Sequence, residues 1–524
     1  MNESQHASSP GGGAAPANVP DPEHPTGQEL PRRHSCDPPE SLIAKFREAA
    51  IRPSSPDVAY RYAELRAAQD KMLRSGSEIS ISETVHSRAV GGGSVSSSSA
   101  HRLRPRRGIG GTRPSLLERQ VAALVDASSR HRYTHDPSRD MQALASDRST
   151  SLASTVTESI DVLTGVFASD AVANGRYRLL DFSFIPTIPP AVAQYWSSIG
   201  NPESLGRCAG RRVGMSDVAA IQATVDTFRR MDDRYGGGHA RMTAVRYLHS
   251  EVTPLLKGSY GDKVGRRLFS ATADLTQLAG WMAYDIGEHG LAQRYFIQAL
   301  RLTRTSGDRA LGGYILSRMS RQATYLHRPQ AAVDLGKAGR EAAAALATPT
   351  AMALFYAVEA RGYGLMGDIR ACVSALGHAE RHLGLARPGA EPPWSTFFNE
   401  AQLSDEFAHC FRDLGRPREA AGFAERSLQL RSNWYARSRA FCRTVLATAY
   451  LQQGELDQAC HTAGQALQGI GDLRSIRGRE YVRDFCSRLA PYRHVRAVRD
   501  FCARVDACIG SKETTAGRSA FLAY

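Results

Sequence analysis

The segment ATAYLQQGELDQACHTAGQAL (Ala447–Leu467) decides the fold of this 524-residue chain. A second segment, GWMAYDIGEHGLAQRYFIQAL (Gly280–Leu300), carries small or apolar residues at the same offsets. Small residues at these spacings allow two antiparallel helices to pack closely and then to stack on the next pair. The two segments therefore predict an array of helical repeats.

The pattern recurs five times along about 310 C-terminal residues, with a period near 39. The small reference residue of the second helix recurs after 39, 41, 48 and 39 residues, and the longest step contains the proline-rich turn Pro388–Pro393. Four of the five turns between paired helices carry glycine, which tolerates the backbone of a chain reversal. The reference residues are Ala292, Ala331, Cys372, Ala420 and Ala459, and the turn residues are Gly287, Leu326, Gly367, Gly415 and Gly454.

We therefore expect an all-α protein, a right-handed superhelix of helix pairs behind a largely disordered N-terminal region. Two C-terminal helices, Tyr481–Leu489 and Val495–Cys508, are predicted to cap the array, because a terminal repeat otherwise leaves an apolar face in water. The expected regions are 1–113 (low complexity with short helices), 114–177 (short helix and linker), 178–212 (proline-containing strap), 213–510 (helical repeats) and 511–524 (tail).

The strap and the start of the array are marked by local signals. Pro186, Pro189 and Pro190 interrupt an apolar stretch that cannot be helical throughout, so an extended segment is expected there. Ser216 or Asp217 is predicted to cap the first helix that follows.

Composition excludes several classes of protein. The net charge of +14 indicates a weakly attractive surface for anions, including nucleic acid, although a coding bias toward Arg and Ala explains it equally. Nine cysteines show neither CxxC nor metal-finger spacing, so we expect no metal or cofactor. Five of them fall inside predicted helices and are expected to be small buried apolar residues in a reducing compartment, namely Cys372, Cys410, Cys442, Cys460 and Cys486. Neither a signal peptide nor an apolar run of membrane-spanning length is recognised, which favours a cytoplasmic protein.

The repeat spacing resembles the tetratricopeptide repeat, which normally has about 34 residues. Longer strings resemble a family of actinobacterial, streptomycete-type regulators of sporulation and antibiotic production, often described as negative regulators of differentiation. The resemblance covers about residues 205–505. The strings are RRVGMSDV (Arg211–Val218), RYGGGHAR (Arg234–Arg241), LAGWMAYDIGEHGLAQRYFIQALRL (Leu278–Leu302), DRALGGYILSRMSRQATYL (Asp308–Leu326), EFAHCFRDLGRPREA (Glu406–Ala420) and YARSRAFCRTVLATAYLQQGE (Tyr435–Glu455).

The chain departs from that family at its N-terminus. Many members carry a helix-turn-helix there, but the nearest candidate, Ser41–Leu73, is broken by Pro53 and Pro56 and lacks a tight glycine-containing turn. A basic stretch follows, which either contacts phosphates in a salt-sensitive way or is merely solvated. Its residues are Arg102, Arg104, Arg106 and Arg107.

The inward positions of the family's repeats map onto a polar and aromatic set in this chain. Such a set suits an extended peptide, a protein segment or a small polar ligand, because aromatic rings supply contact area and charges fix the register. Trp281 and Tyr284 are alternatively packed between neighbouring repeats. The predicted groove residues are Asp274, Gln277, Trp281, Tyr284, Asp285, Ser320, Thr324, Arg361, Asp405, His409, Arg412, Thr448 and Gln452.

No nucleophile-elbow, zinc-protease, P-loop or dinucleotide-binding motif is present, so we expect no enzymatic activity. The expected function is that of a cytoplasmic regulator of development and secondary metabolism that binds a peptide, small signal or protein in its concave groove. The alternative is a DNA-binding transcriptional repressor with the array as sensor or dimerisation domain. A homodimer is left open by the sequence.

Overall fold

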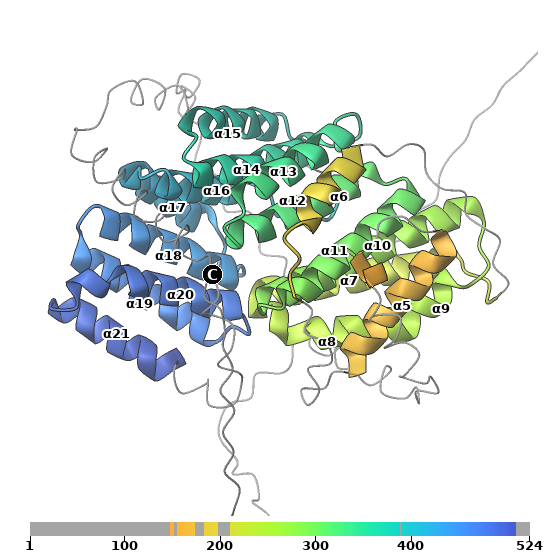
Figure 1. Cartoon of the computed structure of the whole chain (residues 1–524), viewed down its shortest axis with the longest axis horizontal. Coiled ribbons are helices and arrows are strands. Elements are labelled where there is room, and N and C mark those ends of the chain that lie inside the picture. The colour runs from red at the N-terminus through yellow and green to blue at the C-terminus, as the bar shows by residue number, and fades with distance from the viewer. Residues whose placement is uncertain (1–146, 151–154, 173–182, 198–209, 388, 510–524) are drawn as a thin grey trace, which may run out of the picture. The chain divides into compact units, whose positions relative to one another are not determined.

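A computed structural model describes residues 147–150, 155–172, 183–197, 210–387 and 389–509. The regular secondary structure of these residues is helical, and their one β-type pairing is an isolated bridge between Arg212 and Ser259 (Figure 1). The all-α fold expected from the repeats is confirmed. The candidate Ser41–Leu73, the basic stretch 102–107 and the tail 511–524 lie outside the described residues.

Five consecutive helix pairs occupy the region predicted to hold the repeats. Within each pair the two helices pack along their length, and the second helix also contacts the first helix of the next pair. The pairs are α10 (Asp262–Asp285) with α11 (His289–Ser306), α12 (Arg309–Tyr325) with α13 (Pro329–Ala343), α14 (Pro349–Met366) with α15 (Ile369–Gly384), α16 (Glu400–Asp413) with α17 (Pro417–Leu430), and α18 (Ala436–Gln452) with α19 (Leu456–Gly471).

The turns inside the pairs depend on a left-handed backbone. All four predicted turn glycines adopt positive φ, which side chains other than glycine rarely tolerate. These φ values are 81° at Gly287, 74° at Gly367, 66° at Gly415 and 83° at Gly454.

The second pair shifts the predicted register by one residue. Leu326 has an ordinary φ of −83°, and it is His327 that adopts the positive φ of 52°. As a consequence the residue that occupies the reference position is Ala332, not Ala331. The Ala332 amide donates to the carbonyl of Arg328, four residues earlier. The amides of the other four reference residues likewise donate to the carbonyl four residues before them.

Small residues let the paired helices approach closely. A Cβ added to Gly280 of α10 would lie 2.9 Å from Tyr295 Cβ on α11. A Cβ added to Gly313 of α12 would lie 2.8 Å from the carbonyl oxygen of Gly339 on α13. Both distances are below van der Waals contact, so these positions exclude any larger side chain without a shift of the helices.

Two helical stretches precede the pairs. They are α7 (Met215–Tyr235) and a continuous run of α8 (Gly237–Tyr247), a π-helical turn (Leu248–Val252) and α9 (Thr253–Leu256). Gly236, at φ 86°, separates the two stretches. The N-cap of α7 is Gly214 rather than Ser216 or Asp217, and Asp217 instead accepts the amide of Gly214 at 2.9 Å.

The proline-containing strap differs from the extended segment expected. Its described part contains α6 (Ile188–Ser197), with Pro189 and Pro190 in the first turn, where amides have no partner within the helix. α6 packs against α12 and α13, and Trp196 is buried against Gly312.

A helix that the sequence did not predict lies in the expected linker. This helix, α5 (Val156–Val172), packs against α8 and α11. Asp170 on α5 accepts the Tyr295 hydroxyl at 2.6 Å and pairs with Arg241. The buried carboxylate therefore ties α5 to the first repeat.

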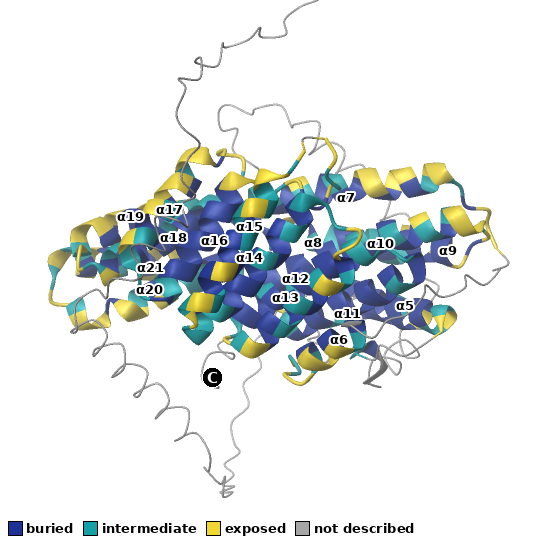
Figure 2. Ribbon diagram, turned by 90° about the horizontal axis from the view of Figure 1, so that it is seen from above, coloured by how far each residue is buried: buried dark blue, intermediate teal, exposed yellow. Residues whose placement is uncertain are grey.

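The predicted capping pair is confirmed as α20 (Ile476–Arg488) and α21 (Arg496–Ile509). Val482, Phe485 and Phe501 join the apolar core of α18 and α19 and cover the last repeat. Figure 2 shows that exposed residues lie along the outer edges of α7, α17, α19 and α21, whereas faces turned toward neighbouring helices are buried.

The shifted turn of the second pair can be tested with a matched pair of substitutions. We expect His327→Gly to raise the free energy of unfolding by up to about 1 kcal/mol, because glycine removes the strain of positive φ. Leu326→Gly should lower it by about 0.5–1 kcal/mol, because Leu326 gains nothing from added backbone freedom. Urea unfolding followed by circular dichroism measures both, and effects of the opposite sign would contradict the register described above.

Candidate functional site

The first helix of each pair faces the inside of the array. Successive first helices, including α20 of the capping pair, pack against one another, whereas the second helices from α11 to α19 make no comparable contact with each other within the described residues. The exception among the second helices is α21 of the capping pair, which packs on α19. The first helices therefore line the concave side of the superhelix. We call the inward face of α10, α12, α14, α16, α18 and α20 the inner wall.

All the predicted groove residues lie on these helices, but they do not form an open groove. Asp274 and Arg412 are partly exposed, and Gln452 is exposed. At the other positions the inner wall is filled by side chains from elsewhere in the chain. The buried positions are Gln277, Trp281, Tyr284, Asp285, Ser320, Thr324, Arg361, Asp405, His409 and Thr448.

Trp281 on α10 contacts three guanidinium groups of the inner wall. The guanidinium carbon of Arg318 lies 4.0 Å from the centroid of the indole, that of Arg477 5.2 Å and that of Arg437 5.9 Å. A cation over an aromatic face is attracted by the ring quadrupole, more strongly when water is excluded. Trp281 thus brings together α10, α12, α18 and α20.

Arg477 of α20 occupies an aromatic cage. Its guanidinium carbon lies 4.2 Å from the ring centroid of Tyr284, 4.9 Å from that of Phe441 and 5.8 Å from that of Tyr325, in addition to Trp281. We call these four rings the Arg477 cage. The nearest carboxylate is that of Asp285, with Nη1 and Oδ1 3.8 Å apart, which is an ion pair but not a hydrogen bond.

A buried ion pair joins the two ends of the array. Arg437 on α18 forms a bidentate pair with Asp232 on α7, at 2.7 and 2.8 Å, between residues 205 positions apart in sequence. Arg437 also lies 3.6 Å from Asp285, which in addition accepts a hydrogen bond from the amide of Gly237 at 2.9 Å. These contacts between the two ends of the array close the superhelix, and they are mainly ion pairs.

Backbone hydrogen bonds reinforce the closure. The amide of Arg474, between α19 and α20, donates to the carbonyl of Tyr235 at 2.9 Å, and its carbonyl accepts the amide of Gly238 at 2.8 Å. Gly236 and Gly238 permit this approach, since an added Cβ would lie 3.1 and 2.8 Å from the Arg474 carbonyl oxygen. The triple glycine 236–238 thus forms the contact between the start of α8 and the segment that joins α19 to α20.

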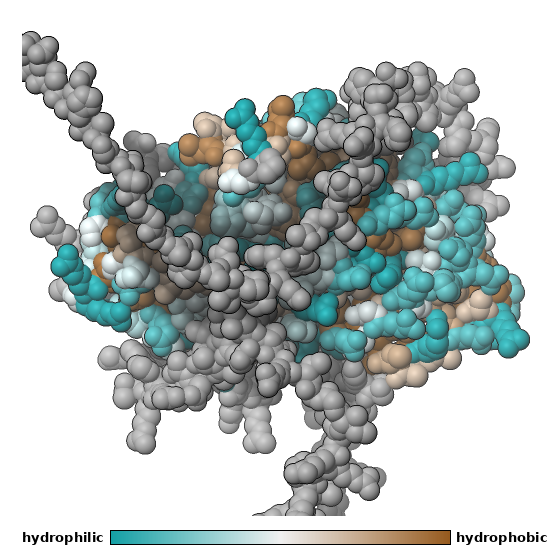
Figure 3. All heavy atoms as spheres, turned by 180° about the vertical axis from the view of Figure 1, so that it is seen from behind, coloured by the Kyte–Doolittle hydropathy of each residue, from teal (hydrophilic) through white to brown (hydrophobic). Residues whose placement is uncertain are grey.

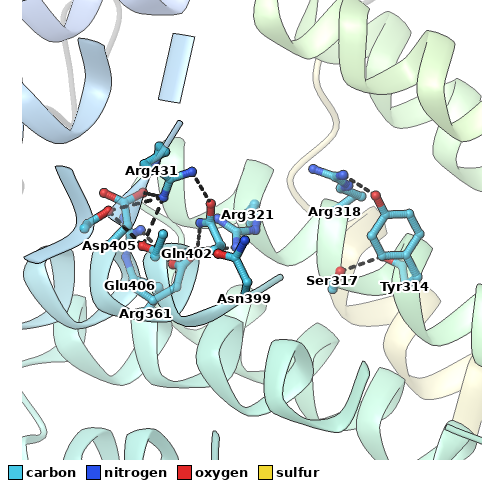
Figure 4. Close-up of polar contacts among 12 residues, drawn as sticks. Tyr314, Ser317, Arg318, Arg321, Arg361, Asn399, Gln402, Asp405, Glu406 and Arg431 are labelled. Atoms are coloured by element: carbon cyan, nitrogen blue, oxygen red, sulfur yellow. Dashed lines mark hydrogen bonds and ion pairs between the residues drawn. The ribbon is translucent and has the colours of Figure 1, made fainter. Parts of the chain in front are cut away.

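A second charged cluster lies on α16 (Figure 4). Glu406, fully buried, pairs with Arg321 and with Arg361 and accepts the amide of Gln402 at 2.7 Å. Burial opposes its charge, but the two arginines hold the pKa of Glu406 below its usual range. Burial raises the pKa of the adjacent Asp405, whose partner Arg431 lies 3.7 Å away.

Several inner-wall residues keep a buried polar atom without a hydrogen-bond partner within the described residues. Buried polar groups are normally hydrogen-bonded, and each unpaired group costs about 1–3 kcal/mol. The inner wall therefore has unused hydrogen-bond donors and acceptors that polar groups of another molecule could pair with. These atoms are Gln277 Oε1, Asp285 Oδ1, Thr324 Oγ1, Arg361 Nε, Asp405 Oδ1, His409 Nδ1, and Nε and Nη1 of Arg477.

A small cavity of about 130 Å³ opens beside the α16 cluster. Its walls include Asp233 at the end of α7, Phe397 of the 385–399 connection, and Arg431 and Tyr435 near α18. Burial, opposed by Arg437, raises the pKa of Asp233 to about 6. The cavity is far below the roughly 300–1,000 Å³ typical of small-molecule sites.

The sequence predicted the helices of the inner wall but not the arginine side chains that pack against its aromatic and acidic residues. Arg318, Arg437 and Arg477 carry most of the interactions, and none was singled out. The signal that could have found Arg477 is its position four residues before Tyr481, which places both on one face of the capping helix.

Within the described residues, no three His, Cys, Asp or Glu side chains gather where they could hold a metal ion. None of the helices there is long and apolar enough to cross a bilayer. On the face shown in Figure 3, hydrophilic residues alternate with smaller hydrophobic areas. No known family model matches the chain, and no curated protein is significantly similar to it, so the resemblance to actinobacterial regulators stays a prediction.

Truncation of the closing ion pair should destabilise the fold strongly. Arg437→Met leaves Asp232 buried and unpaired, and we expect a loss of about 3–5 kcal/mol in the free energy of unfolding. The double variant Arg437→Met, Asp232→Leu should recover part of that loss, because both buried charges are then removed. Urea unfolding provides the measurement, and a double variant less stable than Arg437→Met alone would contradict this account.

His289, which contacts the rings of Tyr284 and Tyr325, predicts a pH dependence of stability. Burial, and then the charge of Arg477, lower the pKa of His289 from 6.5 to about 4. A depressed histidine pKa means that the unfolded chain binds the proton more readily, so stability is complete above pH 6.5 and falls as the pH drops toward 4.

We expect His289→Gln to remove about 2–3 kcal/mol of the stability difference between pH 7.5 and pH 4. Carboxylates titrate in the same range, so the comparison is between variant and parent at each pH. His461→Gln, at an exposed position of α19, is the matched control. A stability difference between His289→Gln and the parent that does not change with pH would refute the assignment.

Proposed function

We propose that this chain is a non-enzymatic regulator that binds a protein or peptide partner through its inner wall. The observation that carries the proposal is that the part of the inner wall formed by α10, α12 and α18 already holds a segment of polypeptide, Arg474–Tyr481, which leads into the capping helix α20. It does so through cation–π contacts, an ion pair and ring stacking. These are the interactions with which interfaces anchor arginine and tyrosine side chains.

A polypeptide partner fits this surface better than a small molecule does. Unpaired polar atoms are spread over α10, α12, α14, α16 and α20 rather than gathered around one pocket. Aromatic rings and charges of both signs accompany them along the wall, which suits the alternating chemistry of a peptide. The cavity of about 130 Å³ is too small for most metabolites.

The regulatory setting is proposed from the resemblance of the strings within 211–455 to actinobacterial regulators of sporulation and antibiotic production. Helical-repeat arrays present extended concave binding surfaces, and such a surface is consistent with an adaptor that captures another regulator. The cytoplasm is the proposed compartment, because Cys372, Cys410 and Cys442 are buried thiols rather than disulfides.

The binding surface can be tested by site-specific photo-crosslinking in cells of the source organism. A benzophenone amino acid placed at Gln452, the exposed inner-wall residue of α18, should yield a covalent adduct with a specific protein partner. The same amino acid at Leu385, exposed at the end of the outer helix α15, is the matched control. Equal adducts from both positions, or none from Gln452, would count against the inner wall as the binding surface.

A further inference from the structure

We propose that the Arg477 cage is a binding site for an arginine side chain of the partner, and that Arg477 is its occupant in the unbound chain. This inference rests on the proposed function and assigns a ligand chemistry to one part of the inner wall. Four aromatic rings from three helices surround the guanidinium, and Asp285 supplies the opposite charge. A guanidinium suits this cage because its planar group can stack on the rings and pair with the carboxylate at the same time.

Arg477 and the carboxylate of Asp285 beside the cage keep hydrogen-bonding atoms without a hydrogen bond. The Nε and Nη1 of Arg477 are buried without a hydrogen bond, and Asp285 Oδ1 also accepts none. Nη1 and Oδ1 are 3.8 Å apart, whereas a charge-assisted hydrogen bond between a guanidinium and a carboxylate is about 2.7–2.9 Å long. A guanidinium that approached about 1 Å closer would gain a hydrogen bond that Arg477 lacks.

The position of α20 explains the imperfect fit. Its apolar face is fixed by Val482, Phe485 and Leu489 in the core of the capping pair. Arg477 is only the second residue of the helix, so its reach into the cage is set by a backbone anchored elsewhere. An arginine on a separate peptide is free of that constraint.

The same arrangement allows Arg477 to leave without unfolding the cap. After Arg477, the anchoring residues of α20 begin five positions later, at Val482. Before it, Leu473 lies in the same core, and the backbone of Arg474 is hydrogen-bonded to Tyr235 and Gly238. Helix ends open more readily than helix centres, so release of the two Arg474 bonds and of the first turn of α20 would vacate the cage while Val482 and Phe485 stay packed. The exchange is therefore a local event.

Tyr481 indicates what accompanies the arginine. It follows Arg477 by four residues and stacks on Phe441, with centroids 4.8 Å apart and the rings almost parallel. Residues four apart lie on one face of a helix, so one helical turn delivers both groups to the inner wall. The partner we infer is a helical segment with arginine and, four residues later, an aromatic residue.

Chemical rescue tests the cage directly. In the full chain, Arg477→Ala should lower the midpoint temperature of unfolding, and ethylguanidinium at about 10 mM should restore part of the loss, because binding to the folded state alone stabilises it. Ethylammonium, which has the same charge but no planar group, should restore less. Arg479→Ala, two residues along α20, is the control variant and should not respond to ethylguanidinium.

A peptide supplies the second measurement. A fluorescent peptide of residues 474–489, with Cys486 replaced by serine, should bind the Arg477→Ala chain at least about tenfold more tightly than the parent chain, because the cage is vacant only in the variant. The same peptide with Arg477→Ala should lose this preference. If Arg477→Ala fails to fold, Arg477→Gln keeps the aliphatic part of the side chain and removes the guanidinium from the cage.

The inference is overturned if ethylguanidinium and ethylammonium act alike, or if the peptide binds parent and variant equally. Failure of the proposed function is a different result. In that case the cage responds to ethylguanidinium and to the peptide, but the crosslinker at Gln452 captures no protein.

Discussion

The buried ion pair between Arg437 and Asp232 is the constraint on which the rest of the architecture depends. A charge taken out of water destabilises the fold by several kcal/mol unless a partner meets it with good geometry. Here the partner lies at the opposite end of the array, so burial of the inner arginines requires that the superhelix closes on itself. In the closed array most of the predicted groove residues are removed from solvent, whereas Asp274, Arg412 and Gln452 stay partly or fully exposed.

Two kinds of contact consequently stabilise different parts of the fold. Apolar contacts and small residues hold each helix to its neighbours along the array, and they act between residues close in sequence. Charged and aromatic side chains hold the inner wall across the closure, between residues far apart. The burial of apolar side chains, which has no preferred direction, therefore determines how the helix pairs stack. The ion pairs and hydrogen bonds of the inner wall, which are directional, determine how the stack bends.

The predictability of the structure from its sequence follows the same division. The five pairs, the turn glycines and the cap were correctly predicted because each depends on local periodicity. The register at Leu326 failed because His327 adopts a conformation usually reserved for glycine, and α6 was missed because two prolines fall in its first turn. The inner-wall positions were placed on the right helices, but the burial of Trp281 and Tyr284 by Arg477, from the far end of the array, could not be read from local spacing.

Closure also fixes the number of repeats. An open solenoid can gain or lose one repeat and remain a solenoid, because each repeat contacts only its neighbours. In this chain a repeat added between α7 and α18 would carry Arg437 one helix pair away from Asp232 and leave both charges buried alone. The evolution of the array is thus restricted to changes within repeats. Length variation is confined to segments such as the 385–399 connection, whose length does not affect the distance between Arg437 and Asp232.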